Sequence, residues 1–216
     1  MNAPMPFQEA VDFFRSKVNL PSAAWTDFKE GAHARAFTVA GATTYALVED
    51  FRAALDKAIA EGRTKEDFLK DFDRIVAAHG WSYNGGRGWR AAVIYNTNLR
   101  TARAAGRWAE IERNRAVRPY IRYSAVMDGR TRPLHKEWHG IVLPVDHPFW
   151  EANFPPNGWN CRCSALSVSA ADLARRGWQV SAAPEIEMEA RPVKLADGTV
   201  EVWTAPKGVD TGFGYN

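Results

Sequence analysis

Apolar residues recur at helical spacing through most of the first 80 residues. This spacing predicts amphipathic helices over residues 7–18, 22–33 and 43–60. A fourth helix, over residues 64–79, is expected to begin at Thr64, because a threonine hydroxyl can accept a hydrogen bond from the first turn. Residues 1–80 are therefore expected to form a helical N-terminal region.

Glycine and aromatic residues separate this region from a longer helical pattern. Residues 80–88 contain four glycines together with Trp81 and Tyr83, a composition typical of a loop with aromatic anchors. From Trp89 to about Ala116 the apolar positions again follow a helical spacing, which predicts a long helix. Residues 81–118 are thus a second segment, an aromatic and glycine-rich loop followed by a long arginine-rich helix.

The next segment changes character, because β-forming residues and prolines replace the helical pattern. A strand is expected over residues 120–127, and ordered loops rich in proline and aromatic residues over 131–156. A second strand, over residues 163–168, should lead into a short helix over 170–176. Residues 119–178 are therefore expected to form a small, loop-rich α+β unit.

The last segment, residues 179–216, contains two alternating runs around a turn. Residues 191–195 and 199–203 alternate on either side of Asp197-Gly198, which predicts a β-hairpin. Residues 208–216 are expected to be an extended, flexible tail. The whole pattern is that of an α+β protein in which a helical N-terminal region with a long central helix precedes a small loop-rich α+β C-terminal unit and a β-hairpin tail.

The composition is that of a folded globular protein, since 46% of the 216 residues are hydrophobic and 25% are charged. No run of 18 apolar residues occurs, and the first six residues do not resemble a secretion signal, so neither membrane spanning nor secretion is expected. The two cysteines, Cys161 and Cys163, are separated by one residue, a spacing that would strain a disulfide. A reducing compartment such as the bacterial cytoplasm is therefore favoured.

Positive charge is concentrated in the middle of the chain, although the formal net charge is only +3. Residues 71–135 contain twelve arginines, five acidic residues and no lysine. The planar guanidinium group suits defined contacts with phosphate or carboxylate groups. The candidate contacts for nucleic acid or an acidic partner are Arg100, Arg103 and Arg107, which share a face of the expected long helix, together with Arg113 and Arg115. A solvated helix face is the alternative.

Several short motifs follow one another in a fixed order along the middle of the chain. They are Asp73-Arg74-Ile75-Val76, His79-Gly80-Trp81-Ser82-Tyr83-Asn84-Gly85, Thr97-Asn98-Leu99-Arg100-Thr101-Ala102, Asp128-Gly129-Arg130-Thr131-Arg132-Pro133-Leu134-His135, His139-Gly140 and Pro155-Pro156-Asn157-Gly158-Trp159-Asn160-Cys161-Arg162-Cys163. In this order they resemble the phage Mu F-like minor head proteins of the head morphogenesis family. The resemblance is strong over residues 65–170.

The resemblance implies a structural motif that staples the fold and is not catalytic. Its residues are Asp128, Arg130, Arg132, His135, His139, Trp159, Cys161 and Cys163. Many family members carry a Cys-x-x-Cys pair and a His-Pro-x-Cys-Arg-Cys segment here, a set suited to zinc. In this chain Arg132 and His135 occupy the first pair, and Trp159 stands where the second half carries its histidine.

Two interpretations of this altered motif remain open. Structural zinc would be held by His135, Cys161 and Cys163, with His139 as the nearest substitute for a fourth ligand. Without zinc, the cysteines would be small buried hydrophobic residues. In that case Arg132 is expected to lie against Asp128, while Trp150 and Trp159 supply apolar bulk.

The resemblance also implies a function. It indicates a minor capsid protein of a tailed phage or prophage, present in the host cytoplasm during assembly and then in the head interior of the virion. Expected partners are the portal protein and the major capsid or scaffold protein, with double-stranded DNA as a further contact and no membrane. A structural adaptor that does not touch DNA is the nearest variant of this hypothesis.

An enzymatic function is not expected, because the sequence contains no convincing nucleotide-binding loop and no nucleophile paired with a base. No catalytic residue is therefore predicted. The alternative from a different class is a Mu F-like nuclease or toxin-type effector, which would use Asp128, Arg130 and His135 as its acid–base cluster.

Overall fold

The computed structural model describes residues 7–29 and 31–214. The chain divides into two units, of which the first comprises the chain up to Gly106 together with Pro192–Glu201, and the second comprises Arg107–Arg191 and Val202–Asn216. Helices precede most of the strands along the sequence, so the predicted α+β class is confirmed. Within the described residues, no helix is both long enough and apolar enough to cross a bilayer.

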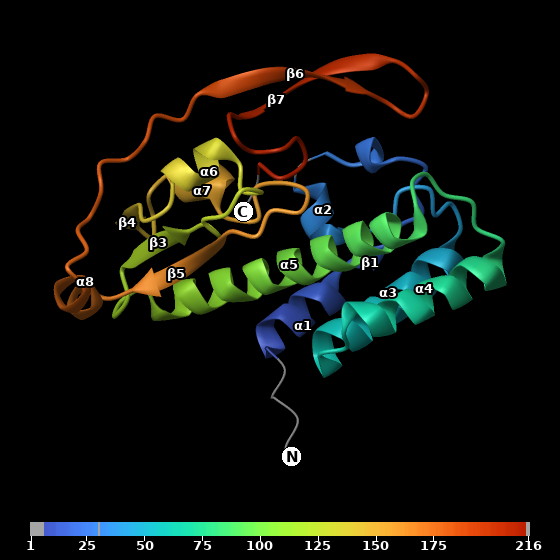
Figure 1. Ribbon diagram of the computed structural model, residues 1–216, viewed down its shortest axis with the longest axis horizontal. Helices are drawn as coiled ribbons and strands as arrows, with labels where there is room; N and C mark the ends of the chain where they lie inside the picture. The colour runs from blue at the N-terminus through green and yellow to red at the C-terminus, as the bar shows by residue number, and fades with distance from the viewer. Residues whose placement is uncertain (1–6, 30, 215–216) are drawn as a thin grey trace. The chain divides into compact units, whose positions relative to one another are not determined.

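Helices dominate the first unit (Figure 1). They are α1 (Gln8–Ser16), α3 (Tyr45–Glu61), α4 (Lys65–His79) and α5 (Arg87–Asn114), whose last turns belong to the second unit. Helix α3 packs against both α1 and α4. The core between them is aromatic, because the ring centroid of Phe51 lies 5.8 Å from that of Phe72 and 5.1 Å from that of Trp81.

The ends of these helices follow local chemistry that was readable in the sequence. The side chain of Thr64 accepts a hydrogen bond from the backbone N–H of Asp67, and the Asp67 carboxylate in turn accepts from the backbone N–H of Thr64. Gly62 and Gly80 end α3 and α4 with φ angles of 72° and 57°, a left-handed conformation that glycine adopts without steric cost. The predicted helices over residues 43–60 and 64–79 are confirmed.

The helix expected over residues 22–33 is wrong. A 3-10 helix (Trp25–Asp27) and a short α2 (Ala32–Arg35) lie there, and residue 30 is outside the described residues. Asp27 Oδ2 accepts hydrogen bonds from the backbone N–H groups of Ala23 and Ala24, at 2.7 and 3.1 Å. A short acidic side chain thus competes with helical hydrogen bonding and closes a local turn.

Two very short strands in the first unit were not predicted. They are β1 (Val18–Asn19) and β2 (Ala36–Phe37), which pair in parallel with Val18 opposite Ala36. Neither strand is long enough to show an alternating pattern, so only their pairing reveals them.

The second unit is built around an antiparallel sheet in the order β4-β3-β5 (Figure 1). The strands are β3 (Tyr120–Ser124), β4 (Val142–Pro144) and β5 (Ser164–Val168), and the helices are α6 (Pro133–Glu137), α7 (Phe149–Asn153) and α8 (Ala170–Arg176). Residues 131–156 were expected to be loops only, and this is corrected by α6, β4 and α7. The three elements are too short for periodicity to reveal them, and Trp150 fixes the segment by donating from its indole N–H to the carbonyl of Pro144 at 3.0 Å.

The predicted hairpin is present and longer than expected. It consists of β6 (Met188–Lys194) and β7 (Val200–Pro206), which form a two-stranded sheet. The residues after it were expected to be extended and flexible, and for residues 208–214 this is wrong. Val209 and Phe213 are buried, and the Phe213 ring lies edge-on to Trp159 with centroids 5.1 Å apart. Apolar side chains at the end of the chain therefore hold it in turns.

Candidate metal centre and arginine-rich helix

His135, Cys161 and Cys163 come together in the second unit, as the sequence predicted for three of the four candidate ligands. His135 lies on α6 and is 1% exposed, and Cys161 lies in the loop before β5 and is 3% exposed. His135 Nδ1 is 3.8 Å from Cys161 Sγ and 3.6 Å from Cys163 Sγ. We call these three residues the thiol–histidine cluster.

The hydrogen bond on the far side of the imidazole indicates which tautomer the ring adopts. His135 Nε2 lies 2.7 Å from the carbonyl oxygen of Gly208. A carbonyl can only accept, so Nε2 carries the proton and donates it. In the neutral ring the lone pair of Nδ1 then faces the two thiols. A backbone carbonyl that orients the second nitrogen in this way is the usual support of a metal-ligating histidine.

The two nitrogen–sulfur spacings of the cluster fit zinc. Tetrahedral geometry with the usual Zn–N and Zn–S bonds places nitrogen and sulfur about 3.5 Å apart. The two observed N–S separations, 3.6 and 3.8 Å, are close to that value. A zinc ion held there would cross-link α6 and the loop before β5.

The pKa values of the two thiols are shifted in opposite directions. Hydrogen bonding from the Cys163 thiol lowers the pKa of Cys161, and burial opposes this while His135 reinforces it. The same contact with Cys161, together with burial, raises the pKa of Cys163. One proton of the pair therefore leaves before the other.

His139 does not join this cluster, which corrects the proposed fourth ligand. Its Nδ1 accepts a hydrogen bond from the backbone N–H of Ala125 at 3.1 Å. Among residues 7–29 and 31–214, the cluster contains no further histidine, cysteine or carboxylate ligand. Tyr123, buried nearby, donates its hydroxyl proton to Asn157 Oδ1 at 2.9 Å, and burial raises its pKa. The chain thus supplies a three-ligand set.

Ion pairs surround the cluster, but the expected pair of Arg132 with Asp128 is wrong. Asp128 instead accepts two hydrogen bonds from Arg162, at 2.8 and 2.6 Å, and this guanidinium holds the pKa of Asp128 well below its usual range. Arg132 Nη2 lies 2.7 Å from Asp210 Oδ2. Arg162, which lies between the two cysteines in the sequence, therefore binds Asp128, because its guanidinium can donate two hydrogen bonds to one carboxylate.

Asp210 is a site residue that sequence reasoning missed. Its carboxylate binds Arg132 and accepts a hydrogen bond from the backbone N–H of Trp159 at 2.9 Å, while its own N–H donates to the carbonyl of Asn157 at 2.9 Å. Gly158 has a φ of 156°, and a Cβ there would meet Asp210 Oδ2 at 2.1 Å. In the sequence, only the Asn157-Gly158 step indicated an unusual backbone conformation, and no pattern linked that step to Asp210. Trp159 itself is exposed, whereas Trp150 is buried.

The residues of the alternative acid–base cluster each have a different environment. Asp128 is occupied by Arg162, and His135 is buried with Nδ1 toward the thiols. Arg130 has a largely exposed side chain, 3.8 Å from Asp128. Asp128 and Arg130 therefore belong to an ion-pair network with Arg162, whereas His135 belongs to the thiol–histidine cluster.

Helix α5 carries the arginines that the sequence marked as contacts, except for Arg115, which follows it. Arg115 forms ion pairs with Glu112 at 3.4 Å and Asp146 at 3.7 Å. Arg100 and Arg113 have further interactions within the chain. In the described ranges, neither Arg103 nor Arg107 has an ion-pair partner, and Arg103 is exposed.

Other arginines of the basic region serve the fold. Arg118 binds the side chain of Ser167 at 2.8 Å and Asp172 at 2.8 Å, and the Arg122 guanidinium lies 4.3 Å from the ring centroid of Trp178. The concentration of arginine in the sequence is therefore partly structural, and it overstates the charge available to a partner.

Residues 49–166 match the family described as Phage Mu protein F like protein. This match covers more than half of the chain and includes the whole thiol–histidine cluster. The chain belongs to this family. The resemblance found in the motifs is thereby confirmed.

Two relatives within the family are similar over most of this chain. The putative capsid assembly protein F of Escherichia phage Mu is 40% identical over 193 residues, which are 83% of this chain and 44% of that protein. The Mu-like prophage FluMu F protein of Haemophilus influenzae is 37% identical over 188 residues, 82% of this chain and 45% of that protein. The chain thus spans less than half the length of these relatives. No solved structure matches it.

Proposed function

We propose that this chain acts as a minor capsid protein in head morphogenesis of a tailed phage or prophage. The family match and the relative described as a capsid assembly protein support this proposal. In it, the protein associates with the portal protein and the inner capsid surface, with the major capsid or scaffold protein as a further partner. It is present in the host cytoplasm during assembly and afterwards in the head interior.

The proposed role is structural and not enzymatic. The buried thiol–histidine cluster and the Asp128–Arg162 and Arg132–Asp210 pairs connect loops of the second unit to one another. Such contacts hold a surface in shape, as an assembly protein requires. A pull-down of the portal protein encoded with this chain, from cells that express both, tests the assembly role directly.

The finer part of the proposal is that α5 contacts packaged DNA. One observation carries it: the guanidinium groups of Arg103 and Arg107 have no ion-pair partner in the described part of the chain, whereas Arg115, Arg118 and Arg87 do. An arginine without an internal carboxylate is available to a phosphate. Arg100 and Arg113 are then supporting contacts, since both have other interactions.

The experiment compares Arg103→Ala/Arg107→Ala with wild type on duplex DNA at increasing salt. Each phosphate contact contributes a slope of about −0.9 to the log–log plot of affinity against salt, so loss of two contacts should flatten it by about 1.8. The matched control is Arg35→Ala/Arg74→Ala, which removes the same charge from exposed positions on α2 and α4. Equal slopes in both variants would refute DNA contact through α5. Loss of portal capture with an unchanged slope would favour an adaptor that does not touch DNA.

A further inference from the structure

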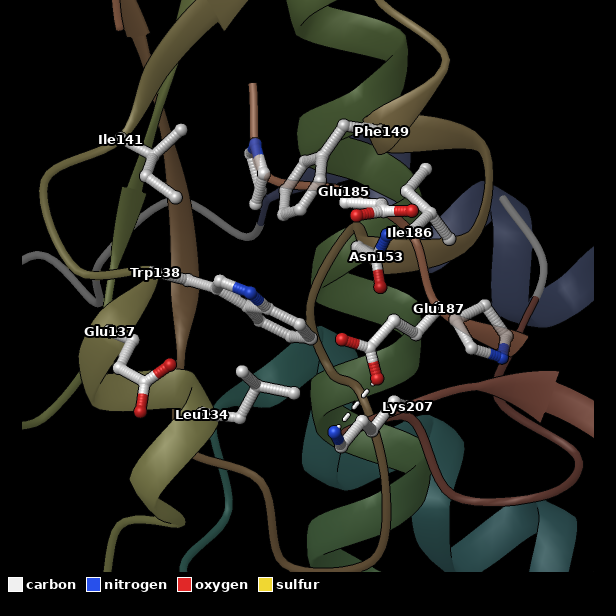
Figure 2. Close-up of a pocket in the computed structure, with 12 residues that line it drawn as sticks. Leu134, Glu137, Trp138, Ile141, Phe149, Asn153, Glu185, Ile186, Glu187 and Lys207 are labelled. Carbon is white, nitrogen blue, oxygen red and sulfur yellow. Dashed lines mark hydrogen bonds and ion pairs between the residues drawn. The ribbon is translucent and has the colours of Figure 1, made fainter. Parts of the chain in front are cut away.

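The second unit contains a cavity of about 250 Å³ that is not lined by the thiol–histidine cluster (Figure 2). Its walls are largely apolar, and they come from Leu134 on α6, Trp138 directly after it, Phe149 on α7, and Ile186 in the extended segment before β6. Pockets for drug-sized ligands usually measure about 300–1,000 Å³. This cavity is smaller, so it suits a single side chain better than a nucleotide.

Asn153 places an unsatisfied acceptor in the cavity. Its side chain lines the space from α7 and is 1% exposed, yet Oδ1 has no hydrogen-bond partner among the described residues (Figure 2). A buried polar atom without a partner costs about 1–3 kcal/mol, so folded proteins rarely keep one without a use. A ligand that brings an N–H group would satisfy this oxygen.

The rim of the cavity is acidic. Glu137, Glu185 and Glu187 line it, with Lys207 as the one cation among the lining residues. Lys207 is already paired with Glu187 at 2.8 Å, as the dashed line in Figure 2 marks. Within the described ranges, Glu137 and Glu185 have no ion-pair partner. The rim therefore carries a net negative charge, although Lys207 also interacts electrostatically with Glu137.

We propose that this cavity binds an arginine side chain from a partner polypeptide. The aliphatic stem of arginine fits walls of leucine, isoleucine and phenylalanine. Its guanidinium has five N–H donors in a planar fork, enough to reach both the Asn153 oxygen and a rim carboxylate, and it stacks on aromatic rings such as Trp138. The charge of the rim selects a cation, and the buried acceptor selects one with several donors.

The test is an NMR titration of the ¹⁵N-labelled full chain with a blocked tripeptide, N-acetyl-Gly-Arg-Gly-amide. The matched probes replace arginine by citrulline, which has nearly the same shape and no charge, and by lysine. The indole N–H of Trp138 and the side-chain amide of Asn153 report on the cavity, and the spectra of Trp138→Phe and Asn153→Leu assign them. We expect the arginine peptide to shift both signals, and the citrulline and lysine peptides to bind more weakly.

Two variants separate binding from folding. Asn153→Leu removes the unsatisfied oxygen, so its thermal midpoint should equal or exceed that of wild type while the arginine peptide loses affinity. Glu137→Gln/Glu185→Gln should weaken binding roughly tenfold, the sum of two exposed ion pairs. The control Glu151→Gln changes an exposed carboxylate on α7 outside the cavity and should bind as wild type does.

Four results would overturn the proposal. One is equal affinity for the arginine and citrulline peptides, since the rim would then not recognise charge. Another is wild-type affinity in Glu137→Gln/Glu185→Gln. The third is a set of peptide-induced shifts that leaves Trp138 and Asn153 unmoved. Equal affinity for the lysine peptide would overturn the assignment of a guanidinium.

Discussion

The double substitution Cys161→Ser/Cys163→Ser tests whether the thiol–histidine cluster holds zinc. Serine keeps the size and the hydrogen-bonding capacity of cysteine but is a poor zinc ligand. His135 remains in place in the variant, because its Nε2 still donates to Gly208. The substitution thus removes two of three ligands and leaves the surrounding packing nearly unchanged.

The two interpretations differ in magnitude. Without metal, the cost is that of burying a hydroxyl in place of the Cys161 thiol, which is about 1–2 kcal/mol and does not depend on zinc. With metal, free zinc at 100 times its dissociation constant stabilises wild type by a further ~2.7 kcal/mol, and the variant gains almost none of this. The decisive quantity is therefore the zinc-dependent part of the free energy of unfolding.

The assay is urea unfolding of wild type and variant, each with zinc and with a chelator, alongside native mass spectrometry. We expect one zinc per wild-type chain, a higher unfolding midpoint with zinc, and neither effect in the variant. If wild type carries no zinc and its midpoint ignores the chelator, the N–S distances reflect packing alone. If the variant also unfolds as wild type does under all conditions, the cluster stabilises nothing and both interpretations fail.

Three further substitutions test the first unit. Burial lowers the pKa of Lys17 to about 8, so above that pH the unfolded chain binds more protons than the folded one. As the pH rises from 8 to 10.5, the free energy of unfolding of wild type should therefore increase by up to ~3 kcal/mol relative to that of Lys17→Met. Urea unfolding of both proteins measures this difference. Gly106→Ala places a Cβ 2.7 Å from the backbone nitrogen of Ala10, so the melting temperature should fall by an amount equivalent to roughly 1–3 kcal/mol. The control Gly129→Ala places its Cβ in open space and should melt as wild type does. Thr64→Ala removes the N-cap of α4 and should cost about 1 kcal/mol in the same assay; no change would mean that the cap is not needed.

Sequence reasoning succeeded where structure is decided within a few residues. The start of α4 follows from Thr64, because its side chain satisfies a backbone N–H group one turn away. The same reasoning failed over residues 22–33. A helical spacing of apolar residues was present, but Asp27 bonded to the backbone three and four residues earlier and closed a turn.

The site residues that the sequence did not reveal lie far along the chain from their partners. Motif spacing pointed to His135 and the two cysteines, which the structure brings together. It could not reveal that the carbonyl of Gly208 accepts a hydrogen bond from His135 or that Asp210 binds Arg132, since 73 and 78 residues separate those pairs. Pairings of that range depend on how the chain returns after β7, and no local pattern encodes them.

Helix α6 and the residue that follows it, Trp138, connect the proposed metal centre to the proposed arginine cavity. His135 belongs to the thiol–histidine cluster, and Leu134 and Trp138 line the cavity. The rings of His135 and Trp138 are stacked, with centroids 5.2 Å apart and planes 15° apart. A metal that fixes the imidazole should therefore also fix the indole that the guanidinium contacts.

This geometry predicts that zinc and the arginine peptide bind with positive coupling. We expect the peptide to bind roughly fivefold more tightly to zinc-loaded wild type than to the chelated protein, a coupling at the lower end of the usual range. By reciprocity, the peptide should tighten zinc binding by the same factor. In Cys161→Ser/Cys163→Ser, peptide affinity should not respond to zinc. Mass spectrometry confirms zinc loading, and circular dichroism confirms that helix content is unchanged. If the peptide then binds zinc-loaded and chelated wild type with equal affinity, α6 is held rigidly without the metal, and the carbonyl of Gly208 alone suffices to orient His135.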